Sequence, residues 1–163
     1  MKLKQVVLKQ NQLVKIILLN VNNNSEEITK MKIVDIEGIG PKYGGMLNEA
    51  GIISADNLLK TGANKKDRNE LAQKTGIDES RILKWVNLCD LCRINGVSTQ
   101  YSELLEAAGV DTVKELRNRN AENLTEKMQE INTEKKLVRV VPGLKSVQSW
   151  VDQAKTLDPI VTY

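Results

Sequence analysis

Apolar residues beyond residue 32 recur at intervals of three and four, the spacing that places side chains on one face of an α-helix. Two stripes of this kind are clearest, one within residues 78–93 and one within residues 144–157. Their members are Ile82, Trp85, Val86, Cys89 and Cys92 in the first, and Leu144, Val147, Trp150, Val151, Ala154 and Leu157 in the second. Such stripes are typical of the buried side of a helix. The pattern therefore predicts an all-α fold packed on these faces.

Residues that start and stop helices divide the chain into short segments. Glycine follows four of the periodic segments, at positions 51, 62, 76 and 109, as C-terminal caps do. Residues of the N-cap type precede three others: Ser54, Asp78 and Asp111. Pro41 stands where the first turn of a helix tolerates proline. We predict about eight short helices, over residues 41–50, 54–61, 65–75, 78–93, 98–108, 112–119, 121–134 and 144–157.

An internal repeat organises these segments. Residues 36–52, IEGIGPKYGGMLNEAGI, align without gaps with residues 94–110, INGVSTQYSELLEAAGV. The alignment pairs isoleucine, glycine, tyrosine and leucine residues with their identical counterparts, and the Ala-Gly pair near the end of each copy also matches. Trp85 and Trp150 then close the two units. The chain therefore contains two similar helical units, at about residues 32–90 and 91–157.

The two units favour one domain over two. A helical unit of this size cannot bury its own apolar face, so the simplest interpretation is that each unit covers the face of the other. No linker rich in Pro, Gly or Ser separates them. We predict a compact, pseudo-duplicated domain over residues 31–158, followed by a tail over residues 159–163.

Residues 1–30 follow a different pattern. Their longest apolar run, residues 16–19, is too short to span a bilayer, and neither a long apolar centre nor a signal-peptide cleavage site is present. Their β-branched residues favour a marginal strand or a poorly ordered arm. Because Met31 stands immediately before the repeat, our hypothesis is that the functional domain starts near Met31 and that residues 1–30 are an accessory arm.

The amino-acid composition limits the catalytic and metal-binding sites that the chain can form. Histidine is absent, which removes the usual general base and the usual zinc ligand, and no catalytic triad or metal-spaced cluster appears. Cys89 and Cys92 form a single CxxC without the second ligand pair that a zinc site needs, so we interpret both as small core residues. We expect a protein without enzymatic activity, cofactor or metal. Free cysteines and the lack of a signal peptide predict a reducing cytoplasm and no membrane association.

The location of the charge matters more than the net charge of +3. Residues 1–30 carry five Lys and two Glu, and the remaining 19 basic and 19 acidic residues cancel. A strongly basic surface that wraps DNA is therefore not predicted, and only a local basic patch remains available.

The stretch IEGIGP, residues 36–41, has the form of a helix-hairpin-helix turn. Gly38 and Gly40 permit positive φ angles and let a phosphate approach the backbone without an intervening Cβ. N–H groups at the start of the next helix and the helix dipole favour an anion there. Ile39 plugs the turn into the core, and Lys42 adds a charge-assisted contact. The candidate nucleic-acid contacts are Gly38, Ile39, Gly40 and Lys42, which would hold DNA or RNA backbone without reading bases.

The glycine turn in the second copy of the repeat is a weaker candidate for phosphate binding. Gly96 is kept, but Ser98 replaces the second glycine, and its hydroxyl can cap the following helix in place of a phosphate. Arg93, just upstream, can compensate in part. We therefore retain Arg93, Gly96 and Ser98 as weaker candidates for nucleic-acid contact. The alternative is a protein-interaction or scaffold module in which both turns are only structural joints.

The order of motifs resembles the DUF4332 family over roughly residues 32–157. The resemblance rests on the first glycine turn, on GVDTVKELRNRN at residues 109–120 and on WVDQAK at residues 150–155. That family is similar to the tandem helix-hairpin-helix domains of DNA ligases, repair nucleases and recombinases. The resemblance thus implies an all-helical, SAM-like or helix-hairpin-helix-like fold and suggests nucleic-acid binding, without implying any particular activity. The sequence departs from the usual pattern at Gly44, where alanine is commoner, and at Ser98.

Overall fold

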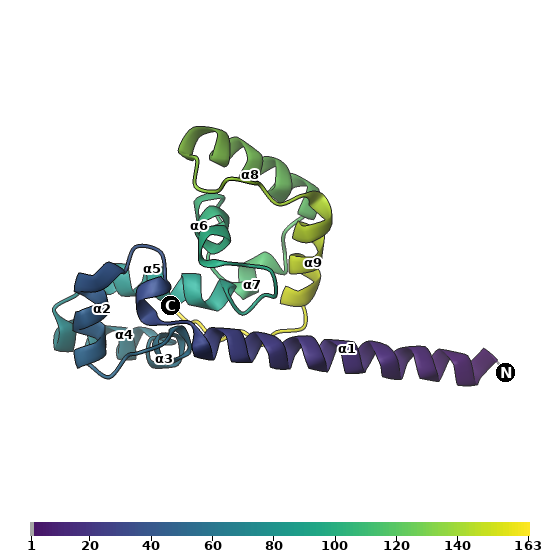
Figure 1. Cartoon of the computed structure of the whole chain (residues 1–163), viewed down its shortest axis with the longest axis horizontal. Coiled ribbons are helices and arrows are strands. Elements are labelled where there is room, and N and C mark those ends of the chain that lie inside the picture. Colours follow the sequence, from purple (N-terminus) through teal and green to yellow (C-terminus); the bar gives the residue numbers. More distant parts are fainter. Residues whose placement is uncertain (1) are drawn as a thin grey trace.

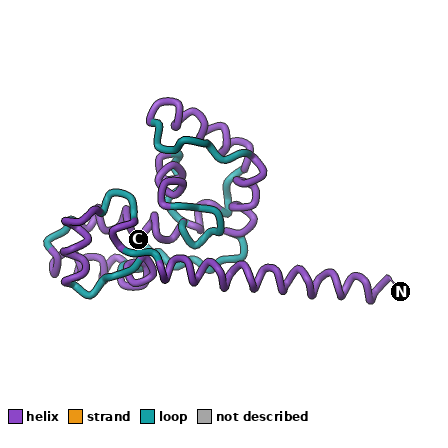
Figure 2. The backbone as a smooth tube through the Cα atoms, viewed as in Figure 1, coloured by secondary structure: helices purple, strands orange, loops and turns teal. Residues whose placement is uncertain are grey.

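A computed structural model describes residues 2–163, apart from the side-chain surroundings of residues 2–4, 17 and 20–25. Over these residues the fold is all-helical, as predicted, with nine α-helices and one 3-10 helix joined by loops (Figure 2). The elements are α1 (Lys2–Lys30), η1 (Ile33–Asp35), α2 (Gly40–Glu49), α3 (Ala55–Thr61), α4 (Lys65–Thr75), α5 (Glu79–Leu91), α6 (Thr99–Ala107), α7 (Val113–Leu116), α8 (Ala121–Lys135) and α9 (Leu144–Ala154). An isolated antiparallel bridge joins Lys32 to Ser54.

The strand expected for residues 1–30 is wrong, because the segment forms the long helix α1 instead of a strand or a loose arm. Residues 2–30 contain no Gly or Pro and are rich in Leu, Lys and Gln, which are good helix formers. β-branched residues become a strand only where another strand pairs with them, and the neighbouring elements are helical. Helix α1 projects away from the rest of the molecule and meets it near its C-terminal end (Figure 1), where Ile28 is buried.

The cap residues fall close to their predicted places. Ser54 accepts a hydrogen bond from Asn57 N–H at the start of α3, and Asp78 accepts one from Ser80 N–H at the start of α5. The predicted cap at Asp111 is displaced by one residue. Thr112 caps α7 by accepting from Glu115 N–H, because Thr112 has the extended backbone of an N-cap.

The buried apolar side chains divide into two clusters and do not form one joint core. The first gathers residues of the first unit, from Ile28 to Cys89, together with Val161 from the C-terminus. The second gathers residues from Leu91 to Ala154. Helix α5 contributes to both clusters and packs on α6, so each unit buries its own apolar face and the shared helix connects them.

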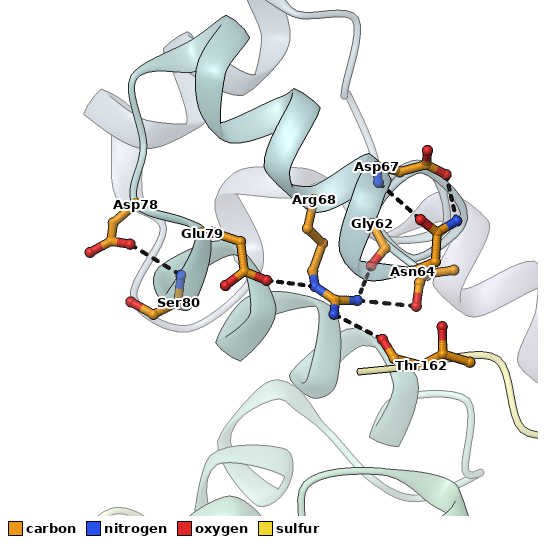
Figure 3. A network of polar contacts seen from close by, with 9 residues as sticks. Gly62, Asn64, Asp67, Arg68, Asp78, Glu79, Ser80 and Thr162 are labelled. Atoms are coloured by element: carbon orange, nitrogen blue, oxygen red, sulfur yellow. Dashed lines mark hydrogen bonds and ion pairs between the residues drawn. The ribbon is translucent and has the colours of Figure 1, made fainter.

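The C-terminal residues 159–163 are more than the tail that we expected, because they return to the first unit (Figure 1). Val161 is buried there, and Thr162 N–H donates to the Ala63 carbonyl at 2.8 Å. The guanidinium of Arg68, only 1% exposed, donates to the carbonyls of Gly62, Ala63 and Thr162 and to the Glu79 carboxylate (Figure 3). One buried cation therefore ties the chain end to α4 and α5.

Candidate functional site: the first glycine turn

The first glycine turn, defined here as residues 36–43, has the backbone that its sequence predicts. Gly38 and Gly40 have φ angles of +84° and +62°, in the left-handed region that favours glycine. Ile39 between them is 2% exposed and belongs to the first hydrophobic cluster, which confirms that it plugs the turn into the core. A Cβ on Gly38 would lie 3.5 Å from Trp85 Nε1, whereas one on Gly40 would meet no described atom within 4 Å. Gly40 thus leaves open space above the backbone.

The start of α2 beside this turn is open to a ligand. The N-cap position is Ile39, so no described side chain caps the helix, and Pro41 occupies its first turn. Residues 34–43 line a concavity of about 520 Å³. Lys42 is exposed, and its Nζ lies 5.9 Å from the centre of the Tyr43 ring on the same turn of α2. The start of α2, with its uncapped N–H groups and the positive end of its dipole, and the cationic side chain of Lys42 therefore line one concavity.

Two acidic side chains disfavour the binding of an anion in this concavity. Asp35 and Glu37 line the concavity, and both are exposed. Glu37 also acts across the interface between the units. Burial raises the pKa of Glu103 in α6, and the neighbouring Glu37 carboxylate raises it further. Any phosphate held by this turn is therefore weakly bound and sensitive to the charge of Glu37.

The second glycine turn, residues 94–101, is bonded internally. Gly96 has a φ of +92°, but Ser98 has a φ of −75° and accepts a hydrogen bond from Tyr101 N–H at 3.2 Å, which confirms the predicted cap. Gln153 of α9 clamps the turn by accepting from Asn95 N–H at 2.9 Å and donating to the Asn95 carbonyl at 3.3 Å. Groups that a phosphate would need are already engaged here.

Arg93, which we expected to contact a phosphate at the second turn, is instead bonded to other residues of the fold. Its guanidinium donates to the Asp90 carboxylate at 2.8 Å and to the Asp158 carbonyl at 2.9 Å, and its side chain is 14% exposed. Asp90 in turn accepts from Val113 N–H at 2.9 Å. Arg93 therefore links α5 to α7 and to the C-terminal segment, and reaching a phosphate would break these bonds.

Comparison with known families identifies the domain. The model of a domain of unknown function, DUF4332, matches residues 37–157, a span that contains nearly all of the first glycine turn and the whole of the second. The chain belongs to the DUF4332 family. No curated protein and no solved structure matches it significantly. The matched region therefore begins within the first glycine turn and ends just after α9.

One cation of the DUF4332 domain near the first glycine turn is not predicted by the sequence. Arg81 of α5 lies with its Cζ 5.0 Å from the centre of the Tyr43 ring, so it flanks the same aromatic side chain as Lys42. Arg81 is 38 positions beyond Tyr43 in the sequence and belongs to a mixed-charge helix start. The only signal that could have found it is its place one helical turn before Trp85, which packs on Tyr43 at 5.2 Å between ring centres.

The two cysteines have the structural role that was predicted. Both are buried free thiols, Cys89 in the last turns of α5 at 0% exposure and Cys92 at its C-cap at 6%. Burial raises the pKa of Cys89 well above its ordinary value and that of Cys92 to about 11, so neither is a ready thiolate. Within residues 2–163, no group of three Cys, Asp or Glu side chains is placed to hold a metal ion. None of the described helices is long and apolar enough to cross a bilayer.

Proposed function

We propose that this DUF4332 protein is a non-enzymatic helix-hairpin-helix module that holds the sugar-phosphate backbone of nucleic acid, preferably duplex DNA, without reading its sequence. The contact is made by the first glycine turn, through the backbone of Gly38 and Gly40 and the side chain of Lys42. The two buried thiols suit a reducing compartment, and we place the protein in the cytoplasm.

The asymmetry between the two turns carries this proposal. The first turn has a second positive-φ glycine, a helix start without a side-chain cap, and an exposed lysine. The second turn has a serine cap in place of that glycine and a glutamine clamp on its backbone. A purely structural turn satisfies its own polar groups, as the second turn does. The first turn leaves the same groups available to an outside acceptor.

The charge of the chain determines how strongly we expect it to bind nucleic acid. Residues 31–163 are neutral overall, and Glu37 adjoins the turn, so only a few phosphates are neutralised. We expect weak binding that is lost at moderate salt, with a slope of log affinity against log salt of about −0.9 per phosphate neutralised. Because the contacts are made to backbone, different duplex sequences should bind with similar affinity.

Fluorescence anisotropy of labelled duplex DNA, single-stranded DNA and RNA at low and moderate salt tests the proposal. Gly40→Asp places a carboxylate in the open space above the turn, and Gly40→Asn is its matched control, since both residues tolerate a φ of +62°. Binding should survive Gly40→Asn and be lost with Gly40→Asp. Lys42→Glu should weaken binding more than Lys42→Gln. Absence of binding to all three nucleic acids at low salt refutes the proposal.

A protein-interaction or scaffold role is the second candidate, and helix α1 favours it. Eight large apolar side chains between Val6 and Leu19 are each more than half exposed, an unusual amount of apolar surface on one projecting helix. Light scattering after size-exclusion chromatography tests self-association through this helix. In that case the wild-type mass exceeds 18.2 kDa, and the double variant Leu13→Gln, Leu18→Gln returns to it. A monomeric wild type that binds DNA leaves the first function in place.

A further inference from the structure

Helix α5 places two functional side chains against the first glycine turn. Trp85 is 2% exposed and puts its Nε1 beneath Gly38, while its ring packs on Tyr43. Arg81 precedes Trp85 by one helical turn and therefore lies on the same side of α5. Its guanidinium reaches the Tyr43 ring at the surface, 5.0 Å from the ring centre. The tryptophan fixes the turn from below, and the arginine flanks it from outside.

Apart from its contact with the Tyr43 ring, the guanidinium of Arg81 makes no hydrogen bond or ion pair among the described residues, unlike most arginines of this chain. Arg68 and Arg93 pair with carboxylates, and Arg117 and Arg119 donate to the carbonyls of Leu157 and Gly109. Among the described residues, no carboxylate or carbonyl accepts from the side chain of Arg81, which is exposed. A guanidinium held over an aromatic face keeps the N–H groups of its edge free, in the planar arrangement that suits phosphate oxygens.

The second unit lacks this arrangement. Ser146 stands four residues before Trp150, where the first unit has Arg81 before Trp85, and Gln100 stands where the first unit has Lys42. Tyr101 packs on Trp150 at 5.5 Å between ring centres, and its hydroxyl donates to the Val140 carbonyl at 3.0 Å. The aromatic pair is therefore common to both units, whereas the two flanking cations belong to the first alone.

We propose that Arg81 of α5 is a second phosphate-binding residue of the first glycine turn, acting together with Lys42 of α2. The two cations flank Tyr43 and contact neighbouring phosphates of one nucleic-acid backbone. This inference rests on the proposed function and names the side chain that supplements its backbone contacts. It also defines the binding face as the start of α2 together with the start of α5.

Anisotropy titrations of the full chain with labelled duplex DNA test the inference, using Arg81→Gln and the control Arg139→Gln. Arg139 is also exposed and unpaired among the described residues, but it lies beside Val140, next to the second turn. Arg81→Gln should weaken binding about tenfold, as expected for one charge-assisted hydrogen bond, and reduce the salt slope by about 0.9. Arg139→Gln should change affinity less than twofold. Arg81→Lys, which keeps the charge but not the planar fork, should fall between wild type and Arg81→Gln.

Three outcomes separate the inference from the function on which it rests. If wild-type protein binds DNA and Arg81→Gln binds equally well with the same salt slope, Arg81 is not a contact, while the proposed function stands. If both arginine variants weaken binding equally, the effect is general charge and the inference is also wrong. If the wild type binds neither DNA nor RNA, the proposed function itself fails. The urea midpoint of Arg81→Gln should equal that of wild type, which shows that any loss of binding is not unfolding.

Discussion

Replacing Arg68 by methionine tests how the fold is held together. Methionine keeps most of the apolar stem but removes every donor of the guanidinium. Arg68 is 1% exposed and donates four hydrogen bonds, of which one goes to Glu79 at 2.9 Å and three go to backbone carbonyls. The variant therefore leaves a carboxylate without its cation and the carbonyls of Gly62 and Thr162 without their donor, while the Ala63 carbonyl keeps its bond from Thr162 N–H.

The expected loss in the free energy of unfolding follows from these contacts. Breaking a buried ion pair costs about 3–5 kcal/mol, but Glu79 is 26% exposed and regains water, which lowers this part. Each buried acceptor left without a donor adds about 1–3 kcal/mol, less where water enters. We expect a total loss of about 3–5 kcal/mol in the free energy of unfolding. For a chain of this size that corresponds to a fall in Tm of about 6–20 °C.

Urea unfolding followed by circular dichroism measures this loss, with Arg139→Met as the exposed-arginine control, expected within about 0.5 kcal/mol of wild type. Deleting residues 160–163 removes the Thr162 carbonyl that Arg68 binds. Because the two changes break a shared contact, their combined cost should be smaller than the sum of the separate costs. A variant Arg68→Met within about 1 kcal/mol of wild type refutes the view that this cation secures the C-terminal segment.

Three further predictions follow from the structure. Glu37→Gln should tighten DNA binding about twofold to threefold by removing a negative charge beside the turn, and NMR titration should show the pKa of Glu103 moving down towards its ordinary value. Gly38→Ala should lower stability in urea by about 1–2 kcal/mol because its φ is +84°, whereas Gly45→Ala, in helix α2 with open space around it, should raise stability by about 0.5–1 kcal/mol. Burial raises the pKa of Cys92 from 9.0 to about 11, so the folded state holds the thiol proton more tightly than the unfolded state does. The resulting stabilisation is fully present below pH 9.0 and is lost as pH rises towards about 11. Urea unfolding between these pH values should therefore show a smaller decline for Cys92→Ala than for wild type, by up to roughly 3 kcal/mol.

The helices were predictable because their signals are local. Apolar stripes, cap residues and glycines act within one or two turns, so eight of the helices fall within a few residues of their predicted bounds. The serine cap of the second turn was predictable for the same reason. Helix α1 was not, since its β-branched residues favour a strand and its helical state reflects the absence of any partner strand in its surroundings.

The other surprises depend on contacts between distant parts of the chain. Arg68 meets Thr162 across 94 positions of sequence, and Arg81 meets Tyr43 across 38. Nothing in the mixed-charge segments that carry these arginines distinguishes a buried cation from an exposed one. Arg93 was a reasonable phosphate contact by position, yet Asp90, three residues earlier near the end of α5, engages it. Pairing of charges in space decides which arginines remain available.

An NMR titration of the ¹⁵N-labelled protein with duplex DNA at low salt tests the central claim most directly. The account predicts that the amide signals of Gly38, Gly40 and Tyr43 and the side-chain Nε signal of Arg81 shift along a single saturable curve. The signals of Gly96 and Ser98 should stay in place, because the second turn is capped and clamped internally. Equal shifts at both turns, or shifts confined to other elements, would contradict the account.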